Sequence, residues 1–219
     1  MATTTPTSNV LTCLWDQPTE LGQTLDLLSA YGVQGPERLP MGEIDRLLLR
    51  LHRKVCGSDL EFTSRCPGCN AQNAFVLAAE LLPPAQPAWV RVGTGGGVRP
   101  PAAVDLVDLP LDLDAAPLAV LGRCTVGSPS EPATASHLAL AVSLDEVGPL
   151  GLECVDCGRP FEAAVDLGRA VLGAMVARAT ELDREVHLIA TTYGWSLAEI
   201  ESLPDGRREH LVGLIRGER

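Results

Sequence analysis

Apolar residues recur every three or four positions in three stretches of the chain, a spacing typical of amphipathic helices. The first stretch covers residues 20–31, and the second follows a start signal at residues 39–43 and is expected to end at Cys56-Gly57. The third and longest covers residues 167–193, where Gly194 is well placed to act as the C-terminal cap. Each stretch predicts a helix that packs on a core or on a partner.

A capping box predicts another helix start near the C-terminus. Ser196 and Glu199 stand three positions apart, so each side chain can accept a hydrogen bond from the backbone N–H of the other. Pro204 ends this helix, and Asp205 is placed to cap a last helix that carries the apolar residues of 211–215. The chain is therefore expected to end in a group of helices.

Between the second helix and the long one, the pattern changes to short β-prone runs. Residues 60–64 and 73–77 form one pair of candidate strands, and residues 150–153 and 161–165 form another. The segment between the two pairs is rich in Ala, Pro, Gly and Asp, and its apolar residues are interrupted every few positions. It predicts an inserted subdomain of short strands and helices.

Charge and composition exclude several classes of protein. Hydrophobic residues make up 46% of the chain but aromatic residues only 4%, so the expected core is aliphatic. The formal net charge is −11, and no cationic run is longer than a pair such as Arg207-Arg208, which disfavours binding to nucleic acid because phosphate neutralisation needs clustered cations. No apolar run approaches the ~20 residues of a membrane span, and the first residues do not resemble a signal peptide. We expect a cytoplasmic protein, where disulfides are rare.

Two C-x-x-C pairs carry the strongest chemical signal in the chain. Cys66 and Cys69 form the first pair, and Cys154 and Cys157 form the second. Two thiolates at this spacing bind one tetrahedral zinc from a tight turn, and a second pair completes a closed site with no open position for water or substrate. The four cysteines therefore predict one structural Zn²⁺ ion in a zinc-ribbon-like β unit.

The two pairs lie far apart along the chain. Residues 70–153 separate them, whereas a compact ribbon has about 15–20 residues between its pairs. The segment between must leave the site and return to it, so bound zinc would fix one half of the chain against the other, and its binding free energy would become folding free energy. Gly68 and Gly158 are expected to supply the backbone freedom that such turns require.

Other interpretations of these cysteines are weaker. A redox C-x-x-C needs a thioredoxin-like βαβ context, and two disulfides need an oxidising compartment. A degenerate ribbon without metal is not expected to retain all four thiols. The remaining cysteines, Cys13, Cys56 and Cys124, stand in apolar surroundings and are expected to be core residues.

These patterns together predict an α+β fold. We expect four segments: an N-terminal arm and helices over residues 1–59, the zinc-ribbon-like unit over residues 60–84 and 150–165, an inserted subdomain over residues 85–149, and C-terminal helices over residues 166–219.

No set of catalytic residues emerges, so an enzyme with a small-molecule substrate is not expected. The glycine run at residues 93–97 lacks the Gly-Lys-Ser/Thr of a phosphate loop and predicts a flexible turn. The acidic residues between Asp105 and Asp114 lack the EF-hand pattern and predict a solvated strand edge. His52 and His187 lie on predicted helices as surface or boundary residues, at no spacing that suggests a triad.

The helix–turn–helix pattern near the C-terminus does not predict DNA recognition. Residues 178–219 contain six arginines and eight acidic residues, whereas a recognition helix needs a positive balance. A zinc-ribbon regulatory protein that binds nucleic acid or the transcription machinery stays as the alternative function.

Two blocks of the sequence resemble a known family. The first block runs from Leu39 to Leu49 and continues through Gly57 and Leu60 to the pair Cys66-Pro67-Gly68-Cys69. The second block is residues 189–196, followed by Ile200, Leu203-Pro204, Arg207-Arg208 and Leu214-Ile215. Both resemble baseplate hub assembly chaperones of the T-even phage type, a family also encoded in the phage-tail-like gene clusters of contractile injection systems. Residues 85–150 match this family least.

The resemblance implies a non-enzymatic assembly factor or component of a baseplate. Its expected partners are baseplate, hub or spike proteins, with no nucleic acid, no membrane insertion and no small-molecule substrate. It acts either as a transient chaperone in the cytoplasm or as a permanent subunit of the assembled particle. The candidate partner-binding residues are Tyr193, Trp195, Arg207 and Arg208, because aromatic and arginine side chains dominate binding hot spots. Trp195 can equally pack the turn behind the Ser196 cap.

Overall fold

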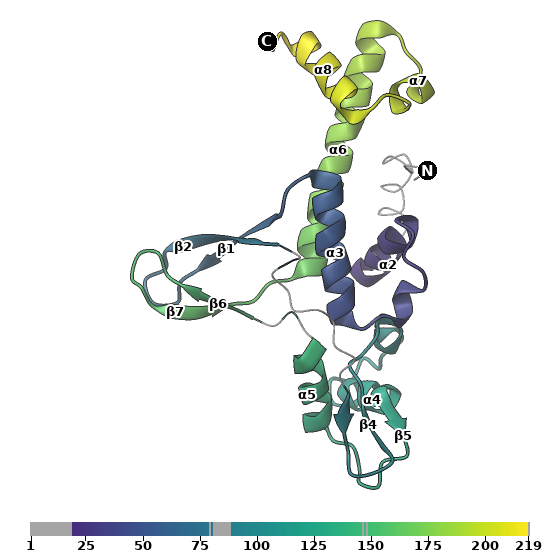
Figure 1. The fold of residues 1–219 in the computed structure, drawn as a ribbon, viewed down its shortest axis with the longest axis vertical. Coiled ribbons are helices and arrows are strands. Elements are labelled where there is room, and N and C mark those ends of the chain that lie inside the picture. Colours follow the sequence, from purple (N-terminus) through teal and green to yellow (C-terminus); the bar gives the residue numbers. More distant parts are fainter. Residues whose placement is uncertain (1–18, 79, 81–88, 146, 148, 219) are drawn as a thin grey trace. The chain divides into compact units, whose positions relative to one another are not determined.

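The structure, a computed structural model, describes residues 19–78, 80, 89–145, 147 and 149–218 (Figure 1). The predicted N-terminal arm and Cys13 lie outside the described residues. The fold is α+β, with helices towards both ends and small antiparallel sheets between them. By their contacts the described residues form two compact units, one within residues 32–171 and one that combines residues 19–31 with residues 172–218. The four segments predicted from the sequence stay a prediction.

The unit that combines the two ends of the chain contains α2 (Glu20–Ala30), most of α6 (Leu167–Tyr193), α7 (Leu197–Glu201) and α8 (Asp205–Arg216). The other unit contains all the strands, and its elements in chain order are η1 (Pro36–Arg38), α3 (Met41–Cys56), β1 (Leu60–Arg65), β2 (Gln72–Leu77), β3 (Val90–Arg91), β4 (Gly96–Val98), η3 (Ala103–Leu106), α4 (Ala115–Cys124), β5 (Thr125–Gly127), α5 (Ala135–Asp145), β6 (Leu150–Glu153) and β7 (Pro160–Ala163). The three helices predicted from apolar spacing are confirmed as α2, α3 and α6. No described helix is long and apolar enough to cross a membrane.

Helix α3 shows how the apolar spacing sets a buried face. Ile44 and Leu48, one turn apart, are both almost completely buried. Gly57 ends the helix in the left-handed conformation, with φ at 73°. His52 was predicted to be a surface or boundary residue, but it lies on the buried face, and its Nδ1 atom is 3.1 Å from the Ser58 carbonyl oxygen. Burial lowers the pKa of His52, so its ring is neutral at pH 7.

Two β-hairpins carry the cysteine pairs at their turns. Strands β1 and β2 pair from Leu60 opposite Leu77 to Arg65 opposite Gln72. Strands β6 and β7 form the second hairpin. The two hairpins lie side by side in Figure 1, although residues 78–149 separate them along the chain.

The residues between the hairpins, hereafter the insertion (residues 89–145), form a small α+β body. Its sheet has the order β3-β4-β5, and helices α4 and α5 pack with the sheet (Figure 1). Cys124, predicted as a core residue, is completely buried there. The buried core of the insertion consists of Val92, Val98, Val120, Leu121, Cys124 and Ala141.

The acidic residues of the insertion do not form the predicted strand edge. Asp105 is buried in η3, where its carboxylate accepts two hydrogen bonds from Arg99, at 2.6 and 3.0 Å, and one from the Ala102 N–H at 2.8 Å. Burial alone would raise the pKa of Asp105, but these bonds outweigh it and lower the pKa. Asp108, Asp112 and Asp114 lie exposed in the loop between η3 and α4.

A buried polar contact joins the insertion to α3. Asp145, at the end of α5, accepts a hydrogen bond on Oδ2 from the Gly42 N–H at 2.7 Å. Arg46 donates to the Asp145 carbonyl oxygen at 3.2 Å, and its guanidinium lies 3.7 Å from the Asp145 carboxylate. A buried charge is costly unless it is paired, so this contact sets the place where α5 meets α3.

The C-terminal helices pack around a small apolar core. Ile189 of α6, Ile200 of α7 and Leu211 of α8 are all buried in it. The predicted capping box is confirmed, since Ser196 and Glu199 accept from each other's backbone N–H at 3.4 and 2.8 Å. The prediction that Asp205 caps α8 is wrong. Pro204 holds the cap position, and Asp205 is the first helical residue, where its carboxylate pairs with Arg208.

A methyl group at Gly42 is expected to disturb the contact between α3 and α5. A Cβ atom on Gly42 would overlap the Asp145 carbonyl group, which is backbone and cannot move away cheaply. Gly42→Ala should therefore lower the free energy of unfolding by about 1–3 kcal/mol. Gly122→Ala is the matched control, because an added Cβ there meets no atom within 4 Å and alanine favours a helix interior. Urea unfolding followed by circular dichroism compares the stabilities of the two variants. Equal unfolding midpoints would contradict the close contact between Gly42 and the Asp145 carbonyl group.

Candidate metal centre

The two cysteine pairs meet where the hairpin turns come together. Cys66 and Cys69 stand between β1 and β2, and Cys154 and Cys157 stand between β6 and β7. All four Sγ atoms lie within 4.8 Å of one another. The Sγ atoms of Cys66 and Cys157 are 3.7 Å apart, and those of Cys69 and Cys154 are 3.5 Å apart. In each of these two close pairs, one thiol therefore comes from the first hairpin and the other from the second.

The two turns have the same backbone hydrogen bonds. The N–H of Cys66 donates to the carbonyl of Ala71 at 2.9 Å, and the N–H of Cys154 donates to the carbonyl of Arg159 at 3.0 Å. In both turns the first cysteine therefore bonds to the residue five positions later. This closes each loop tightly enough to aim both of its thiols at one point.

Each turn also needs one residue in the left-handed region, four positions after its first cysteine. Gly158 holds this position in the second turn, with φ at 67°, as predicted. In the first turn the residue is Asn70, with φ at 62°, and not Gly68. Asparagine is one of the few residues that tolerate this conformation. Gly68 has a different role, because a Cβ atom there would press on the Arg159 guanidinium at 2.9 Å.

The hairpins bury one thiol of each pair. Cys66 and Cys154 are each 2% exposed, and Cys69 and Cys157 lie on the outer side. The backbone N–H of Gly68 donates to the Cys66 sulfur at 3.3 Å. Such N–H···S bonds spread the negative charge that thiolates bring to a metal.

Asn73 of β2 is a supporting residue that cysteine spacing does not reveal. It is 3% exposed, and its side-chain amide donates to the Cys154 sulfur at 3.7 Å and to the Ala71 carbonyl at 3.0 Å. Its Oδ1 atom accepts from the Val155 N–H at 2.9 Å. One amide therefore ties the first hairpin to the turn of the second. The signal in the sequence was a polar residue inside an apolar strand. Whether the Asn73 side chain points inward, however, depends on the register of β2.

The electrostatics of the four thiols favour a bound cation. The backbone amides of Cys157 and Asp156 lower the pKa of the Cys154 thiol to about 6 despite its burial. At Cys69 the Ala71 amide lowers the pKa, but the neighbouring thiols of Cys157 and Cys154 outweigh it and raise the pKa to about 12. One thiolate forms readily and the next is resisted, because negative charges a few ångströms apart repel. A cation at the centre removes that repulsion.

The spacing of the sulfur atoms fits tetrahedral coordination. Metal–sulfur bonds of about 2.3 Å in a tetrahedron place the sulfur atoms about 3.8 Å apart. The separations between Cys69 and Cys154 and between Cys66 and Cys157, 3.5 and 3.7 Å, are close to this value. The four cysteines can therefore hold one metal ion, and four protein ligands leave no position for water or substrate. Elsewhere in the described residues, no other three His, Cys, Asp or Glu side chains come together in this way.

The candidate partner-binding residues lie at the end of α6 and in α8. Tyr193 and Trp195 are 41% and 37% exposed, and their ring centroids are 5.4 Å apart. Arg207 is exposed, whereas Arg208 is 7% exposed and its Nε atom lies 3.7 Å from the buried Glu185 carboxylate. Only Arg207 of the arginine pair reaches the surface.

Replacing one buried ligand should release the metal. In Cys154→Ser three thiolates remain, and a serine hydroxyl is a poor substitute for the fourth. The parent is expected to bind one metal ion per chain, and the variant should lose most of this metal. The variant should also melt at a lower temperature, because the binding free energy contributes to folding. Cys56→Ser, a half-buried cysteine outside the cluster, serves as the control and should keep its metal. Elemental analysis and calorimetry measure both effects, and full metal retention by Cys154→Ser would refute the four-ligand centre.

Asn73 should tune the metal affinity without being a ligand. Asn73→Ala removes the N–H···S bond to Cys154 and leaves the Val155 N–H without its acceptor. Loss of such a supporting contact typically weakens metal binding about 10–100-fold. Competition with a chromophoric chelator measures the change, with the exposed neighbour Gln72→Ala as the control. Equal affinity in the two variants would show that Asn73 has no part in the centre.

Comparisons of this chain with protein-family models, with curated proteins and with solved structures find no match. The metal centre therefore rests on its own geometry, and the family resemblance stays a prediction.

Proposed function

We propose that this protein is a non-enzymatic assembly factor or component of the baseplate of a contractile injection system or phage tail, held together by a structural zinc ion. The observation that carries the proposal is the pair of sequence blocks that resemble baseplate hub assembly chaperones. The first block ends at the cysteine pair Cys66–Cys69, and the second block includes Tyr193 and Trp195. The closed cysteine centre supports a role in which the metal holds the fold and does no chemistry.

Zinc is the metal that best suits this donor set. Four thiolates in a tetrahedron are typical of zinc or of iron, and soft ligands exclude magnesium and calcium. Zinc has no redox chemistry and no geometric preference of its own, which suits a centre whose role is to hold two hairpins together. Elemental analysis separates the two metals directly, and an iron–thiolate centre would colour the protein.

Several features support a non-enzymatic role. The only cluster of metal-ligating side chains in the described residues has no open coordination position. His52 is buried and neutral, and its ring faces a backbone carbonyl and no nucleophile. His187 is exposed on α6. None of these positions suggests a general base beside a reactive group.

The aromatic pair near the end of α6 is the proposed anchor for a baseplate protein. Tyr193, Trp195 and Leu197 follow one another at alternate positions and are each at least 37% exposed. Large apolar side chains that stand together at the surface mark interaction sites more often than isolated ones do. The adjacent Gly194, with φ at 70°, fixes the turn that presents them. A preformed turn binds at a lower entropic cost than a flexible one.

Affinity purification from the native host tests this function. The tagged protein should recover hub, spike or wedge proteins, identified by mass spectrometry, and Trp195→Ala should reduce that recovery at least about tenfold, as for a hot-spot residue. Val76→Ala, which trims an exposed side chain on β2, is the control. Intact sheathed particles purified in parallel separate the two forms of the proposal. Fixed stoichiometry in particles identifies a subunit, and absence from particles identifies a chaperone.

Recovery of nucleic acid or a polymerase without any tail protein would overturn the proposal. It would instead favour the regulatory alternative, whose binding should weaken steeply as salt is raised.

A further inference from the structure

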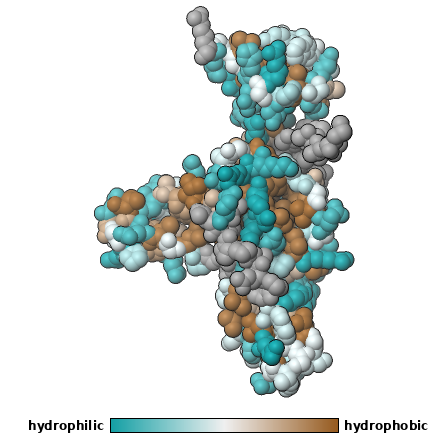
Figure 2. Space-filling model, in the orientation of Figure 1, coloured by the Kyte–Doolittle hydropathy of each residue, from teal (hydrophilic) through white to brown (hydrophobic). Residues whose placement is uncertain are grey.

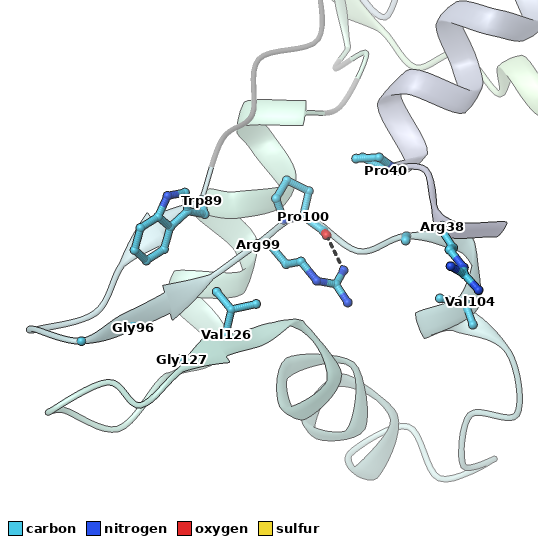
Figure 3. A pocket seen from close by; sticks show the side chains of 11 residues that line it. Arg38, Pro40, Trp89, Gly96, Arg99, Pro100, Val104, Val126 and Gly127 are labelled. Atoms are coloured by element: carbon cyan, nitrogen blue, oxygen red, sulfur yellow. Dashed lines mark hydrogen bonds between the residues drawn. The ribbon is translucent and has the colours of Figure 1, made fainter. Parts of the chain in front are cut away.

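The insertion contains an apolar cavity that the proposed function does not use. Its volume is about 640 Å³, within the range of about 300–1,000 Å³ of binding pockets. Figure 3 shows Trp89 on one side of it and Pro40 and Val104 on the other, with Val126 between them. Trp89 is 47% exposed, so its indole ring has apolar surface to bury.

Closely packed glycines form part of the wall of this cavity. Gly95, Gly96 and Gly127 line it with backbone alone. A Cβ atom on Gly96 would come within 2.5 Å of the Val126 carbonyl oxygen, and one on Gly97 would overlap the Trp89 ring. The glycine run was predicted to be a flexible turn, but Gly96 and Gly97 belong to β4, where they let Trp89 lie against the strand.

Nearby, a loop of the insertion exposes leucine side chains to water. Leu111 and Leu113 are 101% and 88% exposed, whereas leucine is usually among the most buried residues. Figure 2 shows such apolar atoms on the surface of the insertion, beside hydrophilic ones. The segment of residues 107–114 is hereafter the leucine loop.

The leucine loop is held in place at its base. The Arg123 guanidinium of α4 donates to the carbonyls of Asp105 and Val107, at 2.9 and 2.5 Å. The Asp114 N–H donates to the Asp112 carboxylate at 2.8 Å. The two leucines are therefore displayed on an ordered loop, which lowers the cost of binding.

The charges of the cavity and the loop are complementary. The loop carries the exposed Asp108, Asp112 and Asp114, and residues 100–122 contain no Lys or Arg. Arg38 lines the cavity and is exposed, and its Nε atom lies 3.5 Å from the carboxylate of its neighbour Glu37. Arg91, two residues after Trp89, is also exposed. The arginines at and near the apolar cavity thus suit an acidic loop with apolar tips.

We propose that the cavity receives the leucine loop of a second copy of this chain. The loop follows η3, whose Val104 lines the cavity, so the two features are neighbours on one body. Two copies related by a twofold axis then exchange loops, each inserting Leu111 and Leu113 into the cavity of the other. Such a reciprocal contact closes on itself and gives a dimer instead of a filament. This inference does not rest on the baseplate function.

Sedimentation of the purified full chain tests the dimer. The protein should form dimers at micromolar to tens of micromolar concentration, because the contact is small. The double variant Leu111→Ser/Leu113→Ser and the single variant Trp89→Ala should each weaken dimerisation at least about tenfold. Leu140→Ser, which removes an exposed leucine of α5, is the control and should dimerise like the parent.

Mixing the two defective variants separates loss of contact from loss of folding. The loop variant keeps its cavity and the Trp89→Ala variant keeps its loop, so a mixture restores one of the two reciprocal contacts. Fluorescence transfer between differently labelled variants should therefore report association that neither variant shows alone. A monomeric parent at concentrations on the order of 100 µM would overturn the proposal. So would a dimer that both variants leave unchanged, or a mixture that restores nothing.

Discussion

The cysteine centre is the contact on which the arrangement of the two hairpins depends. Each hairpin has its own ladder of backbone hydrogen bonds, but an isolated two-stranded hairpin is at best marginally stable in water. Besides the cysteines, only Phe161 and Ala163 are buried in the apolar cluster that they share. A metal ion bound by the four thiolates would supply what this small core lacks, since structural zinc, the proposed metal, contributes on the order of 10–16 kcal/mol in isolated zinc-finger peptides.

The same centre makes a long insertion tolerable. Closing a long loop costs conformational entropy, although the cost grows only slowly with length. Here the chain leaves after β2 and returns before β6, and a second contact between Asp145 and Gly42 fixes the far end of α5 to α3. The insertion also buries its own core, so it orders itself without contributions from the hairpins. Two anchors and a separate core explain how residues so far apart in sequence meet at one metal site.

The sequence predicts those features that depend on local pattern. Apolar spacing predicts α3 and α6, the Ser196–Glu199 box predicts the start of α7, and the C-x-x-C pairs predict which sulfur atoms meet. Residues whose role depends on tertiary burial are not predictable in this way. His52 and Asp105 look like surface residues in the sequence, and only the packing around them shows otherwise. Asn73 reaches Cys154 only because the register of β2 turns it inward, and spacing along the chain contains no information on that register.

The exposed apolar groups bear on which contacts an acidic protein can make. A net charge of −11 keeps copies apart at long range, so contacts must come from local complementarity. The aromatic pair Tyr193–Trp195 belongs to one compact unit, and the cavity and leucine loop belong to the other. The two surfaces are therefore built from different cores and can be altered independently. With the one surface proposed for its own copy and the other proposed for a partner, the protein would hold two partner molecules at once. That capacity suits an assembly factor, and it requires no catalytic residue.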